Sequence, residues 1–175
     1  MFRRLLSLLS VAALGSLAVP AHAQESPQDN GAPAYVAYID GSATLEREGR
    51  SETSPLNMPL MSGDRLRTDD GRAEVLFDDG SALHLDERTT IDVQSDDLLR
   101  LIDGRIRLNL VGPSRQVDYR IDSPAGSVRI SQNGEYRIAL LHAERETQLE
   151  LAVVRGAGEI FTDQGTTPAR TGVVP

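Results

Sequence analysis

The sequence predicts an all-β protein, a single domain of about ten short strands arranged as two packed sheets or a rolled β-sandwich. From Tyr35 onward, apolar and polar residues alternate in short runs, which is the period of a strand with one buried face. Asp-Gly and Asn-Gly dipeptides separate many of these runs and suit tight turns, because glycine accepts positive φ. Helical pattern is nearly absent, since segments 96–100 and 142–146 are too short for a stable helix.

The N-terminal residues 1–23 have the pattern of a secretory signal peptide. Arg3 and Arg4 are followed by an apolar run over 5–19 and by the small-x-small sequence Ala21-His22-Ala23. The apolar run is too short for a membrane-spanning helix, although an uncleaved anchor is the alternative interpretation. We therefore expect cleavage after Ala23 and a mature protein that is periplasmic or secreted.

Three further regions follow the signal peptide. Residues 24–34 are polar and rich in proline and glycine, which predicts a flexible leader. Residues 35–162 carry the strand pattern and form the predicted β domain. Residues 163–175 have little apolar pattern and are expected to be a C-terminal tail.

The first half of the domain contains the clearest hairpin. Ala73, Val75 and Phe77 alternate with charged residues, the turn sequence Asp78-Asp79-Gly80 follows, and a second run begins at Leu83. The next run, over 106–110, places every second residue on an apolar face.

The second half continues the same period. Alternating runs cover 117–121, 128–130, 136–140 and 149–153. Several strands follow a glycine corner, but the spacing of these corners is irregular and does not define a solenoid repeat. From both halves we expect the following residues to be buried: Val75, Phe77, Ile106, Leu108, Ile130, Tyr136, Ile138 and Leu151.

Composition excludes several classes of function. The net charge is −8, and loss of the two arginines in the signal peptide makes it more negative, which argues against binding nucleic acid. The absence of cysteine excludes thiol catalysis and cysteine–zinc sites. Aromatic residues make up only 4% of the chain, so stacking platforms for sugars or bases are scarce.

Acidic pairs are the only candidates for acid–base chemistry. They occur in turn-like sequences, where aspartate bonds its own backbone, and no calcium-loop pattern closes around them. His84 and His142 make no metal motif, and no nucleophile elbow or phosphate loop occurs. We expect no catalytic residue, no metal site and no cofactor. The acidic pairs are Asp69-Asp70, Asp78-Asp79, Asp86-Glu87 and Asp96-Asp97.

Arginines on the polar faces of strands are the candidate contact residues. If their strands lie side by side, their guanidinium groups form a stripe that binds a carboxylate or phosphate. Cross-strand pairing with Glu74, Asp118, Glu135 or Glu150 explains the same positions without any ligand. The five arginines are Arg105, Arg107, Arg120, Arg129 and Arg137.

An ordered set of segments resembles the FecR domain. The set comprises YVAYIDGSATLE from Tyr35, MPLMSGDRLRT from Met58, RAEVLFDDGSALHLD from Arg72, LIDGRIRL from Leu101, IDSPAGSVRI from Ile121 and VVRGAGEI from Val153. The similarity covers about 35–161. It implies an all-β extracytoplasmic domain without catalysis that serves sensing or protein contact.

Two features depart from the family pattern. Classical FecR proteins carry a cytoplasmic anti-sigma segment and a membrane helix ahead of this domain, whereas this chain has a signal peptide there. The usual Gly-Thr-x-Phe strand is replaced by Gly134-Glu-Tyr136. The chain is therefore more similar to exported FecR-domain proteins than to membrane-anchored sigma regulators.

These observations predict a non-enzymatic binding or sensing module of signal transduction. We expect it to engage a protein partner in the cell envelope or an anionic ligand, to bind no nucleic acid, and to have no stable membrane insertion after processing. One alternative is an envelope polysaccharide hydrolase that uses paired carboxylates. Another is a structural envelope protein that contacts partners through a sheet edge.

Overall fold

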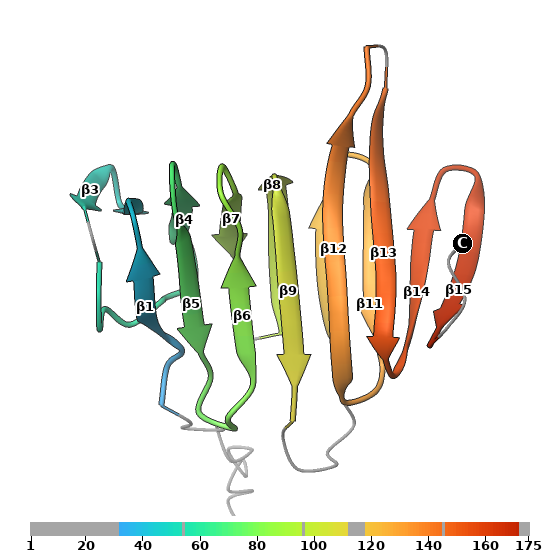
Figure 1. Ribbon diagram of the computed structural model, residues 1–175, viewed down its shortest axis with the longest axis horizontal. Coiled ribbons are helices and arrows are strands. Elements are labelled where there is room, and N and C mark those ends of the chain that lie inside the picture. The colour runs from blue at the N-terminus through green and yellow to red at the C-terminus, as the bar shows by residue number, and fades with distance from the viewer. Residues whose placement is uncertain (1–31, 54, 96, 112–117, 145, 172–175) are drawn as a thin grey trace, which may run out of the picture. The chain divides into compact units, whose positions relative to one another are not determined.

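The computed structural model describes residues 32–53, 55–95, 97–111, 118–144 and 146–171 (Figure 1). These residues form fifteen strands in two sheets, so the prediction of an all-β fold with two sheets is confirmed. No helix of the described residues is long and apolar enough to cross a membrane. The expected signal peptide and most of the leader lie outside the described residues.

The two sheets contain six and nine strands. The six-stranded sheet runs in the order β1 (Tyr35–Asp40), β5 (Arg72–Leu76), β6 (Ala82–Leu85), β9 (Arg105–Leu110), β12 (Gly134–His142) and β13 (Thr147–Arg155). The nine-stranded sheet runs in the order β15 (Gly165–Arg170), β14 (Ala157–Thr162), β11 (Gly126–Ile130), β10 (Tyr119–Ser123), β8 (Leu98–Asp103), β7 (Thr90–Val93), β4 (Arg65–Thr68), β2 (Ala43–Arg47) and β3 (Arg50–Thr53). All neighbouring strands are antiparallel except β8 and β10, which are parallel.

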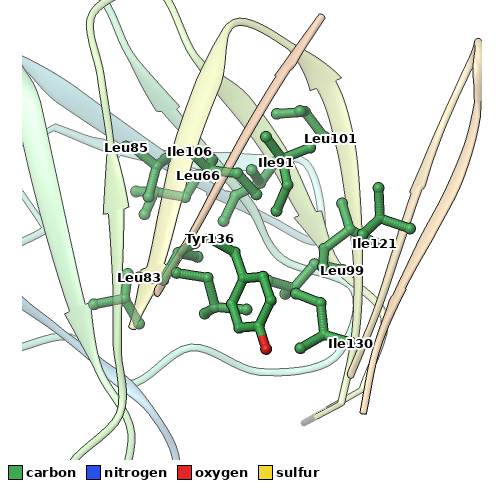
Figure 2. Close-up of a cluster of buried hydrophobic side chains, with 14 of the residues drawn as sticks. Leu66, Leu83, Leu85, Ile91, Leu99, Leu101, Ile106, Ile121, Ile130 and Tyr136 are labelled. Carbon is green, nitrogen blue, oxygen red and sulfur yellow. The ribbon is translucent and has the colours of Figure 1, made fainter. Parts of the chain in front are cut away.

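The hydrophobic core lies between the sheets (Figure 2). Leu83, Ile106 and Tyr136 come from the six-stranded sheet, and Ile91 and Ile121 come from the nine-stranded sheet. Burying an aliphatic side chain of this size contributes about 1.5–3 kcal/mol. The alternation along each strand therefore sends one face to the core and leaves the other for charged residues.

The expected core residues are buried with one exception. Val75, Ile106, Leu108, Ile130, Tyr136, Ile138 and Leu151 are at most 3% exposed. Phe77 is only partly buried. The prediction is wrong for Phe77 because β5 ends at Leu76, so Phe77 lies at the turn and contacts Tyr119 edge-on, with ring centroids 6.0 Å apart.

The chain passes repeatedly from one sheet to the other at tight corners. Gly41 links β1 to β2 with φ of +83°, and Gly71 precedes β5 in the neighbouring corner. A Cβ on Gly41 would lie 2.2 Å from the Asp70 carbonyl oxygen, and one on Gly71 would lie 2.2 Å from the Asp40 oxygen. Both corners therefore need glycine, because their backbones touch.

The sequence underestimates the number of strands. Fifteen are present where about ten were expected. All four residues of β3 are exposed, and β15 buries only Ala169, so neither strand carries a period-two pattern. The expectation that 163–175 is a simple tail is wrong for Gly165–Arg170, which pairs with β14.

Candidate functional site

The structure divides the five candidate arginines between the two sheets. Arg105 and Arg107 lie on β9 and Arg137 on β12, which are neighbours in the six-stranded sheet. Arg120 and Arg129 lie on β10 and β11 of the nine-stranded sheet. All five are exposed, and Arg107, Arg129 and Arg137 lie between two buried residues, as the alternation predicts. The single stripe therefore does not exist, and three arginines form one group and two form another.

The pair on the nine-stranded sheet is neutralised by carboxylates. Arg129 donates from Nε and Nη2 to both oxygens of Asp118, at 2.7 and 2.8 Å. This bond to Arg129 lowers the pKa of Asp118. Arg120 donates from Nε to Asp122 at 2.7 Å. Ion pairing therefore explains these two positions without a ligand. The alternative interpretation named Asp118, whereas the partner of Arg120 is Asp122 of its own strand.

Two of the three arginines on the six-stranded sheet, Arg107 and Arg137, lie in a row that crosses all six strands and begins at Tyr38 on β1. Arg107 faces His84 on one side and Arg137 on the other. Beyond His84 the row continues through Glu74, and beyond Arg137 it ends at Ala152. Directly opposed side chains in antiparallel strands have Cβ atoms about 4.5–5.5 Å apart. The row therefore places two guanidinium groups next to each other, beside an imidazole.

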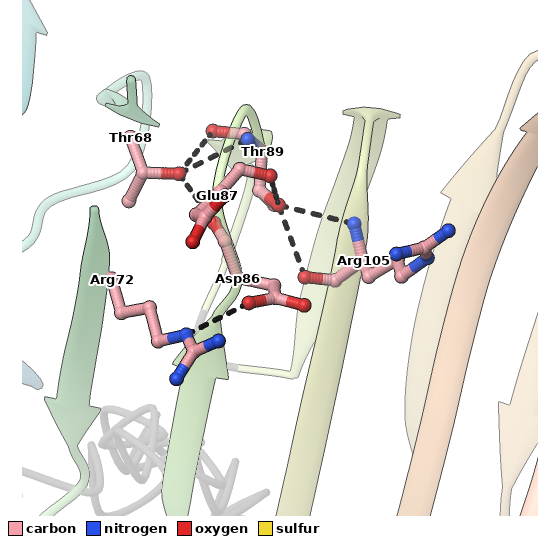
Figure 3. Close-up of polar contacts among 6 residues, drawn as sticks. All are labelled: Thr68, Arg72, Asp86, Glu87, Thr89 and Arg105. Atoms are coloured by element: carbon pink, nitrogen blue, oxygen red, sulfur yellow. Dashed lines mark hydrogen bonds and ion pairs between the residues drawn. The ribbon is translucent and has the colours of Figure 1, made fainter. Parts of the chain in front are cut away.

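Arg105 lies two residues before Arg107, on the same face, and a buried hydroxyl holds its backbone (Figure 3). The Arg105 amide donates to Oγ1 of Thr89 at 3.1 Å, and that hydroxyl lies 3.1 Å from the Arg105 carbonyl oxygen. Thr68 secures Thr89 in turn, because its Oγ1 accepts from the Thr89 amide at 3.0 Å. Both threonines are completely buried. These bonds hold the start of β9 in place.

The outer face of the six-stranded sheet is hollowed around these arginines. The hollow has a volume of about 730 Å³ and is lined by all three. The small side chains of Ala139 and Ala152 form part of its wall. We call the cationic centre of this hollow the arginine groove and define it by four residues: His84, Arg105, Arg107 and Arg137.

Few carboxylates neutralise the arginine groove. Arg137 has one long contact, 3.9 Å from Nη2 to Oε1 of Glu135. Within the described ranges, the side chains of Arg105 and Arg107 make no ion pair. Other arginines, such as Arg65 with Asp92 at 2.6 Å, have close partners. The arginine groove therefore differs in charge balance from the rest of this acidic protein.

His84 is held close to neutral by its surroundings. Burial lowers its pKa, and the positive charge of Arg107 lowers it further. Glu74, whose Oε2 lies 3.2 Å from His84 Nδ1, opposes this shift, as does Glu135. His84 is thus an uncharged member of the groove at neutral pH, and it gains charge only in acid.

In each acidic pair, one described carboxylate makes a contact that serves local structure. Asp69 lies 2.8 Å from Arg67, and Asp86 lies 2.9 Å from Arg72. Asp79 accepts from the Ser81 amide within its turn, at 2.8 Å. Among the described residues, no three His, Asp or Glu side chains are grouped to hold a metal ion. Asp96 lies outside the described residues.

The ion pair between Arg47 and Asp64 was not predicted from the sequence. Asp64 is only 1% exposed and accepts from Nε of Arg47 and from the Met61 amide, both at 2.7 Å. Arg47 also donates to the Pro59 carbonyl oxygen at 2.7 Å. The sequence around Asp64 contains only the turn-like segment Ser62-Gly63-Asp64, which predicts a turn but does not identify Arg47 as the partner of Asp64. The pair ties β2 to the loop before β4 and has a structural role.

Two packed, mainly antiparallel sheets joined by glycine corners define the class of this protein as an all-β sandwich module. The family model described as FecR protein matches residues 64–159. The chain belongs to the FecR family. The whole arginine groove lies within the matched span, and membership of this family supports a role in signalling or regulation.

Solved structures offer a more distant similarity. Two crystal structures of a candidate anti-sigma factor from Parabacteroides distasonis ATCC 8503 align with TM-scores of 0.49 and 0.48, at 13% and 12% identity. Each alignment covers 61% of this chain and 51% of the other, so this chain matches about half the length of those proteins. No curated protein matches the sequence.

Proposed function

We propose that this protein is an extracytoplasmic, non-enzymatic module of a regulatory system, and that it binds an anionic partner of the cell envelope through the arginine groove. One observation carries the proposal: Arg107 directly faces Arg137, and within the described residues the only ion-pair contact of either side chain is the 3.9 Å one between Arg137 and Glu135. Like charges directly opposite in a sheet are destabilising. An anion bound between Arg107 and Arg137 would attract both guanidinium groups and offset their mutual repulsion.

The surrounding chemistry supports binding and offers no catalyst. Asp69, Asp79 and Asp86 of the acidic pairs are each engaged in a turn or an ion pair. The groove itself contains three guanidinium groups, which hold anions well. Regulatory character in the FecR family favours a partner in a signalling pathway over a substrate.

Association with the envelope fraction tests the proposal. The double variant Arg107→Gln/Arg137→Gln removes two charges from the groove. The matched control Arg120→Gln/Arg129→Gln removes two charges from the other sheet, where carboxylates already neutralise them. We expect the exported chain to co-sediment with the envelope, less so at higher salt because ions screen the contact. The groove variant should lose this association and the control should keep it.

Two outcomes would overturn the proposal. Equal retention of both double variants would leave the groove arginines as ordinary surface residues. Turnover of an envelope polysaccharide that disappears in Asp86→Asn would make the protein a hydrolase instead.

The extracytoplasmic location has its own test. N-terminal sequencing of exported protein should begin at Gln24 or at its cyclised form, since cleavage is expected after Ala23. An intact Met1 on the exported protein would contradict the secretory assignment.

A further inference from the structure

The charges around the arginine groove define the size of the anion that fits it. Carboxylates of Glu74 and Glu150 line the hollow on β5 and β13, whereas that of Asp86 is paired with Arg72, which lines the hollow as well. Glu135 stands next to Arg137 on β12. The cationic centre is thus an island enclosed by negative charge in a protein whose net charge is −8.

Such an island discriminates between compact and extended anions. The charges of an acidic peptide or polysaccharide repeat along the chain, so its further carboxylates would meet those of Glu74 or Glu150. A single compact anion places all its charge on the island and avoids the enclosing carboxylates. Electrostatics therefore favour one small multivalent group over a polyanion.

The spacing of the arginines suits a tetrahedral oxyanion. Arg107 and Arg137 are directly opposed. Arg105 and Arg107 are two residues apart on one strand face, or about 6.6 Å. Three long side chains at these separations converge readily on one group. Phosphate offers three acceptor oxygens and close to two negative charges, which the planar guanidinium fork binds bidentately.

From this geometry we propose that the arginine groove binds a single phosphate group, with Arg105, Arg107 and Arg137 as its contacts. This inference rests on the proposed function and names the chemical group that is recognised. The phosphate belongs either to a small soluble molecule or to a lipid headgroup, since both present the same oxyanion to the groove.

The test measures binding of inorganic phosphate to the full chain by titration calorimetry, at constant ionic strength. Removing a charge-assisted hydrogen bond weakens binding on the order of tenfold or more. We therefore expect Arg107→Gln/Arg137→Gln to raise the Kd for phosphate at least that much. Arg120→Gln/Arg129→Gln should bind as the unaltered protein does, which also controls for the lost net charge. Circular dichroism spectra and melting curves establish that both variants are folded.

A second arm separates the two sources of phosphate. Neutral vesicles with and without phosphatidic acid are sedimented with the protein. Retention of the protein only on vesicles that contain phosphatidic acid assigns a lipid headgroup. Binding of inorganic phosphate without such retention assigns a soluble ligand. Either result supports the proposal, provided that the Arg107→Gln/Arg137→Gln variant loses the vesicle retention or the phosphate binding that the unaltered protein shows.

Three results would overturn the inference. The first is equal phosphate binding by both double variants, and the second is tighter binding of a polyglutamate peptide than of phosphate. The third is no phosphate binding while envelope association still depends on Arg107 and Arg137. That third result would leave the proposed function standing with a different anion, so the two failures are distinguishable.

Discussion

Arg107 on β9 and Arg137 on β12 lie directly opposite each other across a strand pair of the six-stranded sheet. A second opposed arginine pair, Arg120 and Arg129, exists on the other sheet, but each of its members holds an aspartate. The Arg107–Arg137 pair therefore suits an anionic ligand, whereas the Arg120–Arg129 pair is already neutralised and only makes the sheet surface polar. It also provides a matched control for experiments.

The two arginine pairs should respond oppositely to neutral substitution. Arg107→Gln removes a repulsion and should raise the free energy of unfolding by about 0.2–1 kcal/mol in the absence of an anion. Arg129→Gln removes the attraction to Asp118 and should leave stability unchanged or slightly lower. Urea unfolding at low salt measures both. A loss of stability in Arg107→Gln would show that this residue has a structural partner.

Asp64 should be the most sensitive carboxylate of the described residues. Burial raises its pKa, but the bonds from Arg47 and the Met61 amide outweigh this effect and lower the pKa below the ordinary value of 3.8. Asp64→Asn should cost about 1–3 kcal/mol, because Arg47 loses its charged partner. Asp69→Asn, which breaks an exposed pair, is the control and should change little.

The pH dependence of stability follows from the same pair. Because the pKa of Asp64 is lower in the folded protein, its contribution is present above pH 3.8 and is lost as the pH falls through the folded value. Denaturation curves between neutral pH and pH 3 should therefore show an acid loss that is smaller in Asp64→Asn. An identical acid loss in the variant would assign it to other carboxylates.

Core truncations should reflect burial along the strands. Ile138 is 1% exposed, so Ile138→Ala should cost about 2–5 kcal/mol through lost burial and the cavity that remains. Phe77 is only partly buried, and Phe77→Ala should cost clearly less. Chemical denaturation of both variants gives the comparison. Equal costs would mean that Phe77 is packed as tightly as the central residues.

Anion binding should couple to protonation of His84. Burial and Arg107 lower its pKa, while Glu74 and Glu135 oppose them, and Arg137 lies next in the row. A bound anion stabilises the protonated ring, so binding should raise this pKa and should tighten as the pH falls through it. Sulfate is the suitable probe, because a phosphate monoester itself titrates near about pH 6.

The control for this coupling is His84→Gln, which has no titrating group at this position. Calorimetric titration with sulfate should show a pH dependence in the unaltered protein that the variant lacks. NMR titration of His84 gives its pKa directly, with and without sulfate. If sulfate leaves that pKa unchanged, His84 does not face the bound anion.

The sequence alone determined the fold class and most of the core. Alternation at a period of two assigns each strand one inner and one outer face, and this is a local property of residues such as Ile106 and Arg107. The strand β3 could not be predicted, because all its residues are exposed and it carries no alternation. Burial of Phe77 was mispredicted, because β5 ends one residue before it.

Which exposed strand faces lie side by side on one sheet depends on the tertiary structure. The chain crosses between the two sheets several times, so Arg107 on β9 and Arg129 on β11, similar in sequence context, lie on separate sheets. Strand pairing brings Arg137 opposite Arg107 from thirty residues further along the chain, and it gives Arg129 an aspartate. Partners across a sheet are set by long-range register, which no local pattern encodes.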